Sequence, residues 1–153
     1  MIYRKRLWTL GLSAALMLSL AGCRPQAVQS DEPADPGQVR LQRIGSAYAQ
    51  AINQLKHGPR SLEELTPFLR REPDGEPLIA AIAGKEVIVI WGLDFRDLTA
   101  RPRPDAPPQA PVLAYESASK DGMRYVLQTA TQVQEMSDED FRAAYFPKGH
   151  KPQ

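Results

Sequence analysis

The chain has 153 residues, of which 42% are hydrophobic and 24% are charged, with 19 basic side chains against 18 acidic ones and a single cysteine. This length is enough for one well-formed hydrophobic core but not for two. The balanced charge leaves no basic excess to suggest nucleic-acid binding, which needs a concentrated positive surface. A single cysteine excludes an internal disulfide or a thiolate zinc site.

The first 22 residues have the layout of a secretory signal peptide. Arg4, Lys5 and Arg6 precede an apolar run from Leu7 to Leu20, and small residues follow. The run is 14 residues long, whereas a helix needs ~20 apolar residues to span a bilayer, so no permanent transmembrane helix is expected. Removal of residues 1–22 would leave 16 basic side chains against 18 acidic ones, a formal net charge of −2.

The end of the apolar run carries the most specific motif in the chain. Leu20-Ala21-Gly22-Cys23 resembles the lipobox of bacterial lipoproteins. The resemblance implies transfer of a diacylglycerol group to the Cys23 sulfur, cleavage between Gly22 and Cys23, and a mature protein held to a membrane by lipid. Acylation would take the only thiol out of chemistry. Arg24 stands where an Asp favours retention in the inner membrane, so the resemblance favours the periplasmic side of the outer membrane.

A tether, one domain and a tail are expected after the lipobox. Residues 23–37 contain three prolines among polar and acidic residues and almost nothing apolar, which is typical of a flexible linker. Residues 38–147 are expected to form a single α+β domain, and residues 148–153 a disordered tail.

The domain is expected to begin with helices. Apolar residues recur at three- and four-residue steps from Gln38 to Lys56, as on one face of an amphipathic helix, and Gly58-Pro59 should end it through a left-handed glycine. Ser61 and Glu64 are spaced as the capping box of a second, short helix. Residues 78–83 are apolar and fit either a helical turn or a short strand.

Next come a strand and a loop. Glu86 to Trp91 is a continuous run rich in β-branched residues, typical of a strand covered on both faces, and we expect it at the centre of a sheet. Residues 96–111 contain five prolines and are expected to form a long surface loop without regular structure.

A meander of strands should complete the domain. Val112–Glu116 and Met123–Gln128 are two predicted strands, joined by a loop that ends in Asp121-Gly122. One register sets aromatic, aliphatic and charged pairs opposite one another. These pairs are Tyr115 with Tyr125, Leu113 with Leu127, and Glu116 with Arg124. Gln132 to Met136 is the third strand of the meander, and residues 137–140 should cap a terminal helix that carries Phe141, Ala144 and Tyr145.

These elements predict an α+β fold, in which an N-terminal amphipathic helix and short helices pack on a small antiparallel sheet of three to four strands. The stretch Gly58–Leu65 and the Asp121-Gly122 hairpin resemble the head of pseudopilins, the pilin-like subunits of type II secretion systems. Pseudopilins begin with a prepilin-peptidase site, and this chain has the lipobox-like sequence in its place. The resemblance therefore implies a shared head architecture without filament assembly.

Few residues suggest a chemistry. Asp94 and Asp97 follow the first strand and fit either a cation or acid–base site, or the polar face of a strand end. His57 and His150 have no neighbour at ligand spacing, so no metal site is expected. The stretch Arg101–Pro104 fits a polyproline II docking peptide or a solvated loop.

We therefore expect a non-enzymatic, lipid-anchored binding or structural module of the cell envelope, without a cofactor or a metal. Its partners would be a membrane, through lipidated Cys23, and an envelope protein, but not nucleic acid. The alternative from a different class is an accessory subunit of a secretion or pilus-like assembly with a pseudopilin-like head. A hydrolase or metal-binding protein that uses Asp94 and Asp97 is the third possibility.

Overall fold

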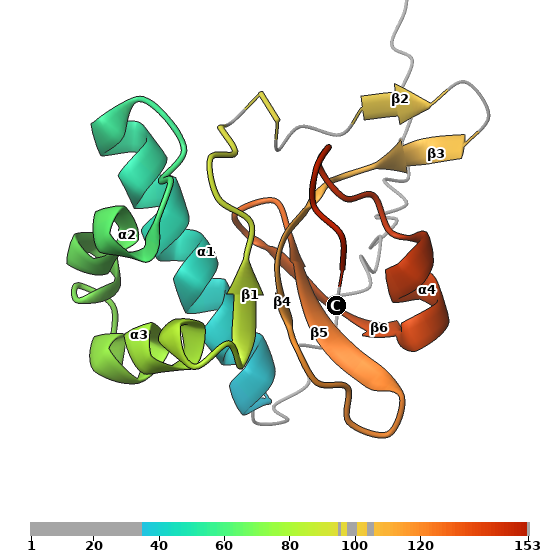
Figure 1. The fold of residues 1–153 in the computed structure, drawn as a ribbon, viewed down its shortest axis with the longest axis horizontal. Coiled ribbons are helices and arrows are strands. Elements are labelled where there is room, and N and C mark those ends of the chain that lie inside the picture. The colour runs from blue at the N-terminus through green and yellow to red at the C-terminus, as the bar shows by residue number, and fades with distance from the viewer. Residues whose placement is uncertain (1–34, 95, 98–100, 104–105, 153) are drawn as a thin grey trace, which may run out of the picture. The chain divides into compact units, whose positions relative to one another are not determined.

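The computed structural model describes residues 35–94, 96–97, 101–103 and 106–152. They form an α+β fold, as the sequence predicts, in which α1, α2 and α3 lie on one face of a four-stranded antiparallel sheet and α4 lies on the other (Figure 1). In chain order the elements are α1 (Pro36–Leu55), α2 (Leu62–Leu69), α3 (Gly75–Ala83), β1 (Val87–Val89), β2 (Arg101–Arg103), β3 (Ala106–Gln109), β4 (Val112–Glu116), β5 (Met123–Gln128), β6 (Gln132–Ser137) and α4 (Asp138–Ala143).

Helix α1 forms because one of its faces is apolar and its first turn is capped. Leu41, Ile44 and Tyr48 are fully buried on that face. The Asp35 carboxylate accepts a hydrogen bond from the Gly37 N–H at 2.7 Å, and a proline stands at the start of the helix, where an amide hydrogen would have no helical partner. The helix therefore begins at Pro36, inside the segment 23–37 that was expected to be a tether.

The end of α1 differs from the prediction. Lys56, not Gly58, adopts the left-handed conformation, with φ of 65°, and its N–H donates to the Ile52 carbonyl at 2.9 Å. Gly58 is required for another reason, since a Cβ at this position would lie 2.1 Å from the carbonyl oxygen of Leu93. The predicted left-handed exit at Gly58 is wrong, because this glycine allows two chain segments to approach each other.

Helix α2 lacks the predicted capping box. Ser61 is its N-cap residue, but the Ser61 side chain makes no capping hydrogen bond, and Glu64 accepts from the N–H of Arg60 at 2.9 Å. The ambiguous segment 78–83 is helical and belongs to α3, where Leu78, Ala81 and Ile82 are buried.

The sheet has the order β1-β4-β5-β6, so β1 is an edge strand. The prediction of a central strand over residues 86–91 is wrong in position, and the strand itself is only Val87–Val89. Val87, Val89 and Ile90 are nevertheless buried, because the packed helices and the neighbouring strand cover them. A continuous apolar run thus indicates burial of the strand faces and not the place of a strand within the sheet.

The strands β4, β5 and β6 confirm the predicted meander, but the predicted register is wrong by one residue. Tyr115 lies opposite Val126, and Ala114 opposite Leu127, with an irregularity between Val112 and Ala114. Asp121 and Gly122 both have positive φ and close the hairpin, as their sequence predicts. Since neighbouring residues of a strand point to opposite faces, the shift places Tyr115 and Tyr125 on opposite sides of the sheet.

The segment 96–111 contains regular structure that its prolines did not predict. β2 pairs with β3 in a separate two-stranded antiparallel sheet, with an irregular register. Proline is tolerated at strand edges, where its missing N–H removes no ladder hydrogen bond. The prediction of a loop without regular structure is therefore wrong for these strands.

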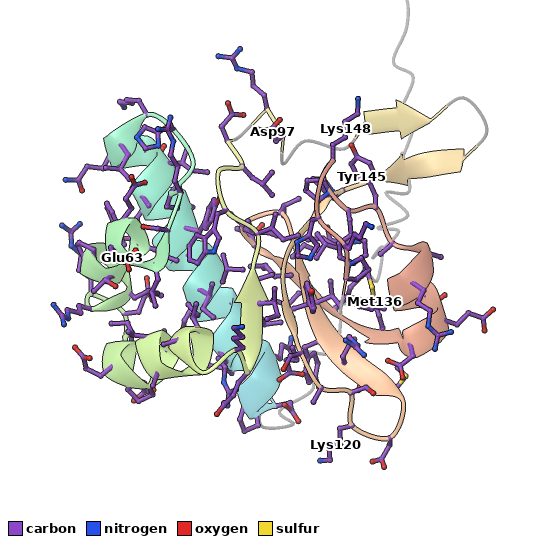
Figure 2. All side chains as sticks on the ribbon, in the orientation of Figure 1. Glu63, Asp97, Lys120, Met136, Tyr145 and Lys148 are labelled. Carbon is purple, nitrogen blue, oxygen red and sulfur yellow. The ribbon has the colours of Figure 1, made fainter. Side chains whose placement is uncertain are left out.

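The second face of the sheet is covered by α4 and by the segment that follows it. Ser137 caps α4 by accepting from the Asp140 N–H at 3.1 Å, as predicted, and the helix ends at Ala143, before Ala144 and Tyr145. The rings of Phe141, Phe146 and His150 pack against Tyr115. The Nε2 atom of His150 lies 3.1 Å from the Tyr115 hydroxyl. The expected disordered tail, residues 148–153, thus includes a histidine placed against the sheet. Figure 2 shows side chains filling the space on both sides of the sheet.

Candidate functional site

The predicted lipidation site is not part of the described structure. Cys23 and the cleavage position between Gly22 and Cys23 lie outside the described residues, and so does the signal peptide. Over the ranges that the structure describes, no helix is both long enough and apolar enough to cross a membrane.

Asp94 and Asp97 lie together in one tight turn after β1. The Asp94 carboxylate accepts from the N–H groups of Arg96, at 2.8 Å, and Asp97, at 3.1 Å, while Asp97 accepts from the Asp94 N–H at 3.1 Å. The backbone hydrogen bonds from Asp97 and then Arg96 lower the pKa of Asp94. Both carboxylates thus accept hydrogen bonds that hold the turn. Within the described part of the chain, no group of three or more His, Cys, Asp and Glu side chains is placed to hold a metal ion.

The Tyr48 side chain, on α1, makes hydrogen bonds to the backbone at the start of this turn. Its buried hydroxyl accepts from the Leu93 N–H at 3.0 Å and lies within 3.3 Å of the carbonyl oxygens of Ile90 and Leu93. Burial is the main reason that the pKa of Tyr48 is raised, and the nearby negative charges of Asp97 and Asp94 add to it. The sequence placed Tyr48 on the apolar face of α1 but contained no signal for this polar role.

The two histidines lie in unrelated surroundings. His57 Nδ1 is 2.9 Å from the carbonyl oxygen of its neighbour Gly58, and His150 packs against Tyr115 and Phe146. Burial lowers the pKa of His150. The stretch Arg101–Pro104 was considered as a docking peptide. Its first three residues form β2, and Pro104 lies outside the described residues.

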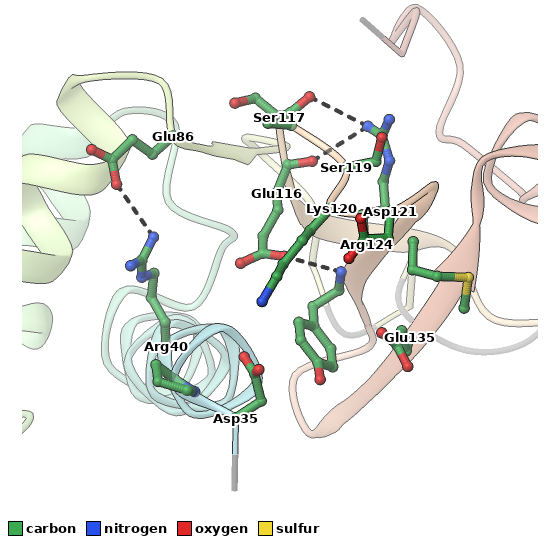
Figure 3. Close-up of a pocket in the computed structure, with 14 residues that line it drawn as sticks. Asp35, Arg40, Glu86, Glu116, Ser117, Ser119, Lys120, Asp121, Arg124 and Glu135 are labelled. Atoms are coloured by element: carbon green, nitrogen blue, oxygen red, sulfur yellow. Dashed lines mark hydrogen bonds and ion pairs between the residues drawn. The ribbon is translucent and has the colours of Figure 1, made fainter.

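A pocket of about 660 Å³ lies between the start of α1, the β4–β5 hairpin and strand β6 (Figure 3). We call it the hairpin pocket. Its lining contains Tyr125, two serines of the hairpin and the charged residues Asp35, Arg40, Glu86, Glu116, Lys120, Asp121, Arg124 and Glu135.

Gly37 allows the wall of this pocket to close on the first turn of α1. A Cβ on Gly37 would lie 2.5 Å from Oε1 of Glu116 and 2.9 Å from the ring of Tyr125. The other carboxylate oxygen of Glu116 accepts from the Tyr125 N–H at 3.2 Å. The Glu116 carboxylate therefore lies against the positive end of the helix dipole and is fixed to the neighbouring strand.

Two of the three cations of the lining have ion-pair partners. Arg40 pairs with Glu86 at 3.3 Å, and Arg124 pairs with Asp138 at 2.8 Å. Arg124 also lies over the ring of Phe141, at 4.3 Å from its centroid. Arg124 thus pairs with Asp138 and not, as the sequence predicted, with Glu116, because the register shift turns Arg124 toward α4.

Sequence reasoning missed the hairpin pocket. Its acidic residues come from four separate segments, and the predicted register paired Tyr125 with Tyr115 and Glu116 with Arg124. The correct register was the only available signal, because it puts Glu116, Tyr125 and Glu135 on the face of the sheet that meets α1. No family model matches this chain, and no curated protein or solved structure matches it either.

Proposed function

We propose that this chain is a lipid-anchored lipoprotein of the cell envelope whose α+β domain is a non-enzymatic binding or structural module. The observation that carries the proposal is the lipobox-like sequence Leu20-Ala21-Gly22-Cys23, which follows three cations and an apolar run. Two or three acyl chains, each stabilised by ~0.8 kcal/mol per buried CH₂, would hold the protein on the membrane. The residue after the cysteine, Arg24, favours the outer membrane over the inner one.

The described domain supports binding over catalysis. Asp94 and Asp97 are the carboxylates that the sequence suggested for acid–base work, and both accept backbone hydrogen bonds within their own turn. The hairpin pocket, by contrast, is open and lined by charged side chains and one aromatic ring. Such a lining is suited to recognising a partner through charge and shape.

Metabolic labelling tests the anchor directly. Cells that express the full chain are grown with labelled palmitate, and the protein is isolated from the membrane fraction. We expect label on the wild-type protein and none on Cys23→Ser, with Ser30→Ala as the control that keeps the label. An unlabelled wild-type protein, or equal labelling of Cys23→Ser, would refute the proposal.

A second candidate function is that of an accessory subunit in a secretion or pilus-like assembly. It is favoured by the 20-residue helix α1 packed along an antiparallel sheet, the arrangement that the pseudopilin-like resemblance implies. Tyr48 and Ile52 are buried, so making them polar would unfold the domain. Photo-crosslinkers at exposed Gln42 and Asn53 of α1 are the better probe. Crosslinks to one assembly component from both positions, and none from Ala83 of α3, would support this candidate.

A further inference from the structure

The hairpin pocket has an excess of negative charge that its own cations do not balance. Among the residues that the structure describes, its lining carries five carboxylates and three cations. Arg40 is paired with Glu86, and Arg124 is paired with Asp138, which lies outside the lining. After these pairs are subtracted, four carboxylates remain with the single ammonium group of Lys120. Two of them, Asp35 and Glu116, each accept one backbone hydrogen bond and keep their negative charge. The pocket therefore attracts a cationic group and repels an anionic one.

An aromatic ring lies among these carboxylates. Tyr125 packs against the first turn of α1 and is partly exposed at the pocket. Its pKa is raised by burial and then by the negative charges of Asp35, Glu135 and Glu116, so the phenol lies within the field of all three. A ring face beside carboxylates is an arrangement that binds ammonium and guanidinium groups, through cation–π attraction together with charge pairing.

The pocket borders a second groove, between α1 and α3, whose lining is partly apolar and partly charged. A second cavity, of about 510 Å³, shares Pro36, Arg40 and Glu86 with the hairpin pocket. Its lining combines the apolar side chains of Val39 and Pro77 with the ion pair of Arg43 and Asp74. The two cavities together are far larger than a single cation. They offer one surface to a basic side chain and a second, mixed surface to the residues next to it.

We propose that the hairpin pocket binds a lysine or arginine side chain of a polypeptide partner, held between the ring of Tyr125 and the carboxylates of Glu116 and Glu135. The groove between α1 and α3 receives the residues next to that side chain. This inference rests on the proposed role of the domain as a binding module, and it names the class of partner.

Lys120 gives the proposal a distinctive consequence. Figure 3 shows Glu116 and Lys120 both directed into the pocket from the hairpin. The Lys120 ammonium competes with an incoming basic side chain for the same carboxylates. Removing its charge should therefore strengthen binding, whereas loss of a lining carboxylate should weaken it.

Fluorescence anisotropy can measure both effects. The purified full chain, in detergent, is titrated into a labelled peptide of sequence Gly-Leu-Lys-Leu-Gly and into the same peptide with Glu in place of Lys. The wild-type protein should prefer the lysine peptide. Glu135→Gln should raise its Kd about threefold, and Lys120→Gln should lower it about threefold, as for one solvent-exposed charge contact.

Two controls change the net charge equally at positions outside the pocket. Glu139→Gln matches Glu135→Gln, and Lys148→Gln matches Lys120→Gln, and neither control should change the Kd by more than about 1.5-fold. Tyr125→Leu should weaken binding about threefold through loss of the cation–π contact. Circular dichroism of each variant verifies that the fold is retained.

Three results would overturn the proposal. They are equal binding of the two peptides, an effect of Glu139→Gln as large as that of Glu135→Gln, and binding of free lysine amide as tight as that of the peptide. The last result would leave a small-amine site in place of a polypeptide site. Palmitate labelling at Cys23 reports only on the anchor, so failure of the anchor and failure of peptide binding are separate outcomes.

Discussion

The hydroxyl of Tyr48 provides a sharp test of how the turn after β1 is held. The substitution Tyr48→Phe removes one oxygen atom and leaves the buried ring in place. In the native protein that oxygen accepts from the Leu93 N–H at 3.0 Å and lies near two backbone carbonyls. Phenylalanine leaves the Leu93 N–H without this acceptor in a region where Tyr48 is fully buried.

The magnitude follows from the lost hydrogen bonds. Leaving a buried backbone donor without its partner costs about 1–3 kcal/mol of folding free energy. For a domain of this size, each kcal/mol lowers the Tm by about 4 °C, so Tyr48→Phe should lower it by about 4–12 °C. Tyr125→Phe is the matched control, because the Tyr125 ring is only partly buried, and its change should stay within about 0.5 kcal/mol.

Urea unfolding followed by circular dichroism measures both variants at pH 7. The m-value should stay unchanged, because neither substitution alters the surface exposed on unfolding. If Tyr48→Phe costs less than about 0.5 kcal/mol, or no more than Tyr125→Phe, the hydrogen bonds of Tyr48 do not hold the turn and the argument fails.

Three further predictions concern a glycine and two titratable groups. Gly58→Ala should lower the free energy of unfolding in urea by about 3 kcal/mol or more, because its Cβ would meet the Leu93 backbone. Gly84→Ala is the control, because its Cβ meets nothing closer than 3.1 Å, and its change should stay within about 1 kcal/mol. Equal effects of the two substitutions would contradict the steric argument. The pKa of Asp138 is lowered, first by its hydrogen bond from Arg124, so its contribution to stability is present above an unfolded pKa of about 3.9 and is lost below it. Asp138→Asn should lower the Tm at pH 7 and reduce the further loss of stability in acid, and an unchanged acid profile would count against the ion pair. The pKa of His150 is lowered by burial, so its contribution is full above an unfolded pKa of about 6.5 and is lost as the pH falls. His150→Gln should flatten the pH dependence of the Tm between 7 and 5, and a slope equal to that of the wild type would refute this.

The local signals in the sequence predicted the elements better than their arrangement. Apolar periodicity placed α1, and the Asp121-Gly122 pair placed the hairpin between two strands with the predicted bounds. The irregularity in β4 between Val112 and Ala114 moved the register by one residue. The pairing of side chains across the two strands did not reveal the error, because the predicted register also set three plausible pairs opposite one another. Backbone irregularities of this kind have no strong sequence signal.

The candidate site was harder to predict than the fold. Asp94 and Asp97 are conspicuous in the sequence because they are close together, yet their closeness is what lets them bind their own backbone. The residues of the hairpin pocket are far apart in the sequence, and only the packing of α1 on the sheet brings Asp35 and Glu135 to one place. Proximity in sequence thus pointed to a structural turn and away from the hairpin pocket.

Asp35 has both a structural role in α1 and a place in the hairpin pocket. It caps the first turn of α1 through the Gly37 N–H, and it lines the hairpin pocket. A cationic ligand that binds the Asp35 carboxylate would weaken its hydrogen bond to the Gly37 N–H. Ligand binding in the hairpin pocket and fraying of the first turn of α1 would then be thermodynamically coupled. By linkage, the factor by which affinity differs between the capped and the frayed first turn equals the factor by which bound ligand shifts the capping equilibrium. Hydrogen exchange of the first amides of α1 is therefore a label-free measure of occupancy of the hairpin pocket.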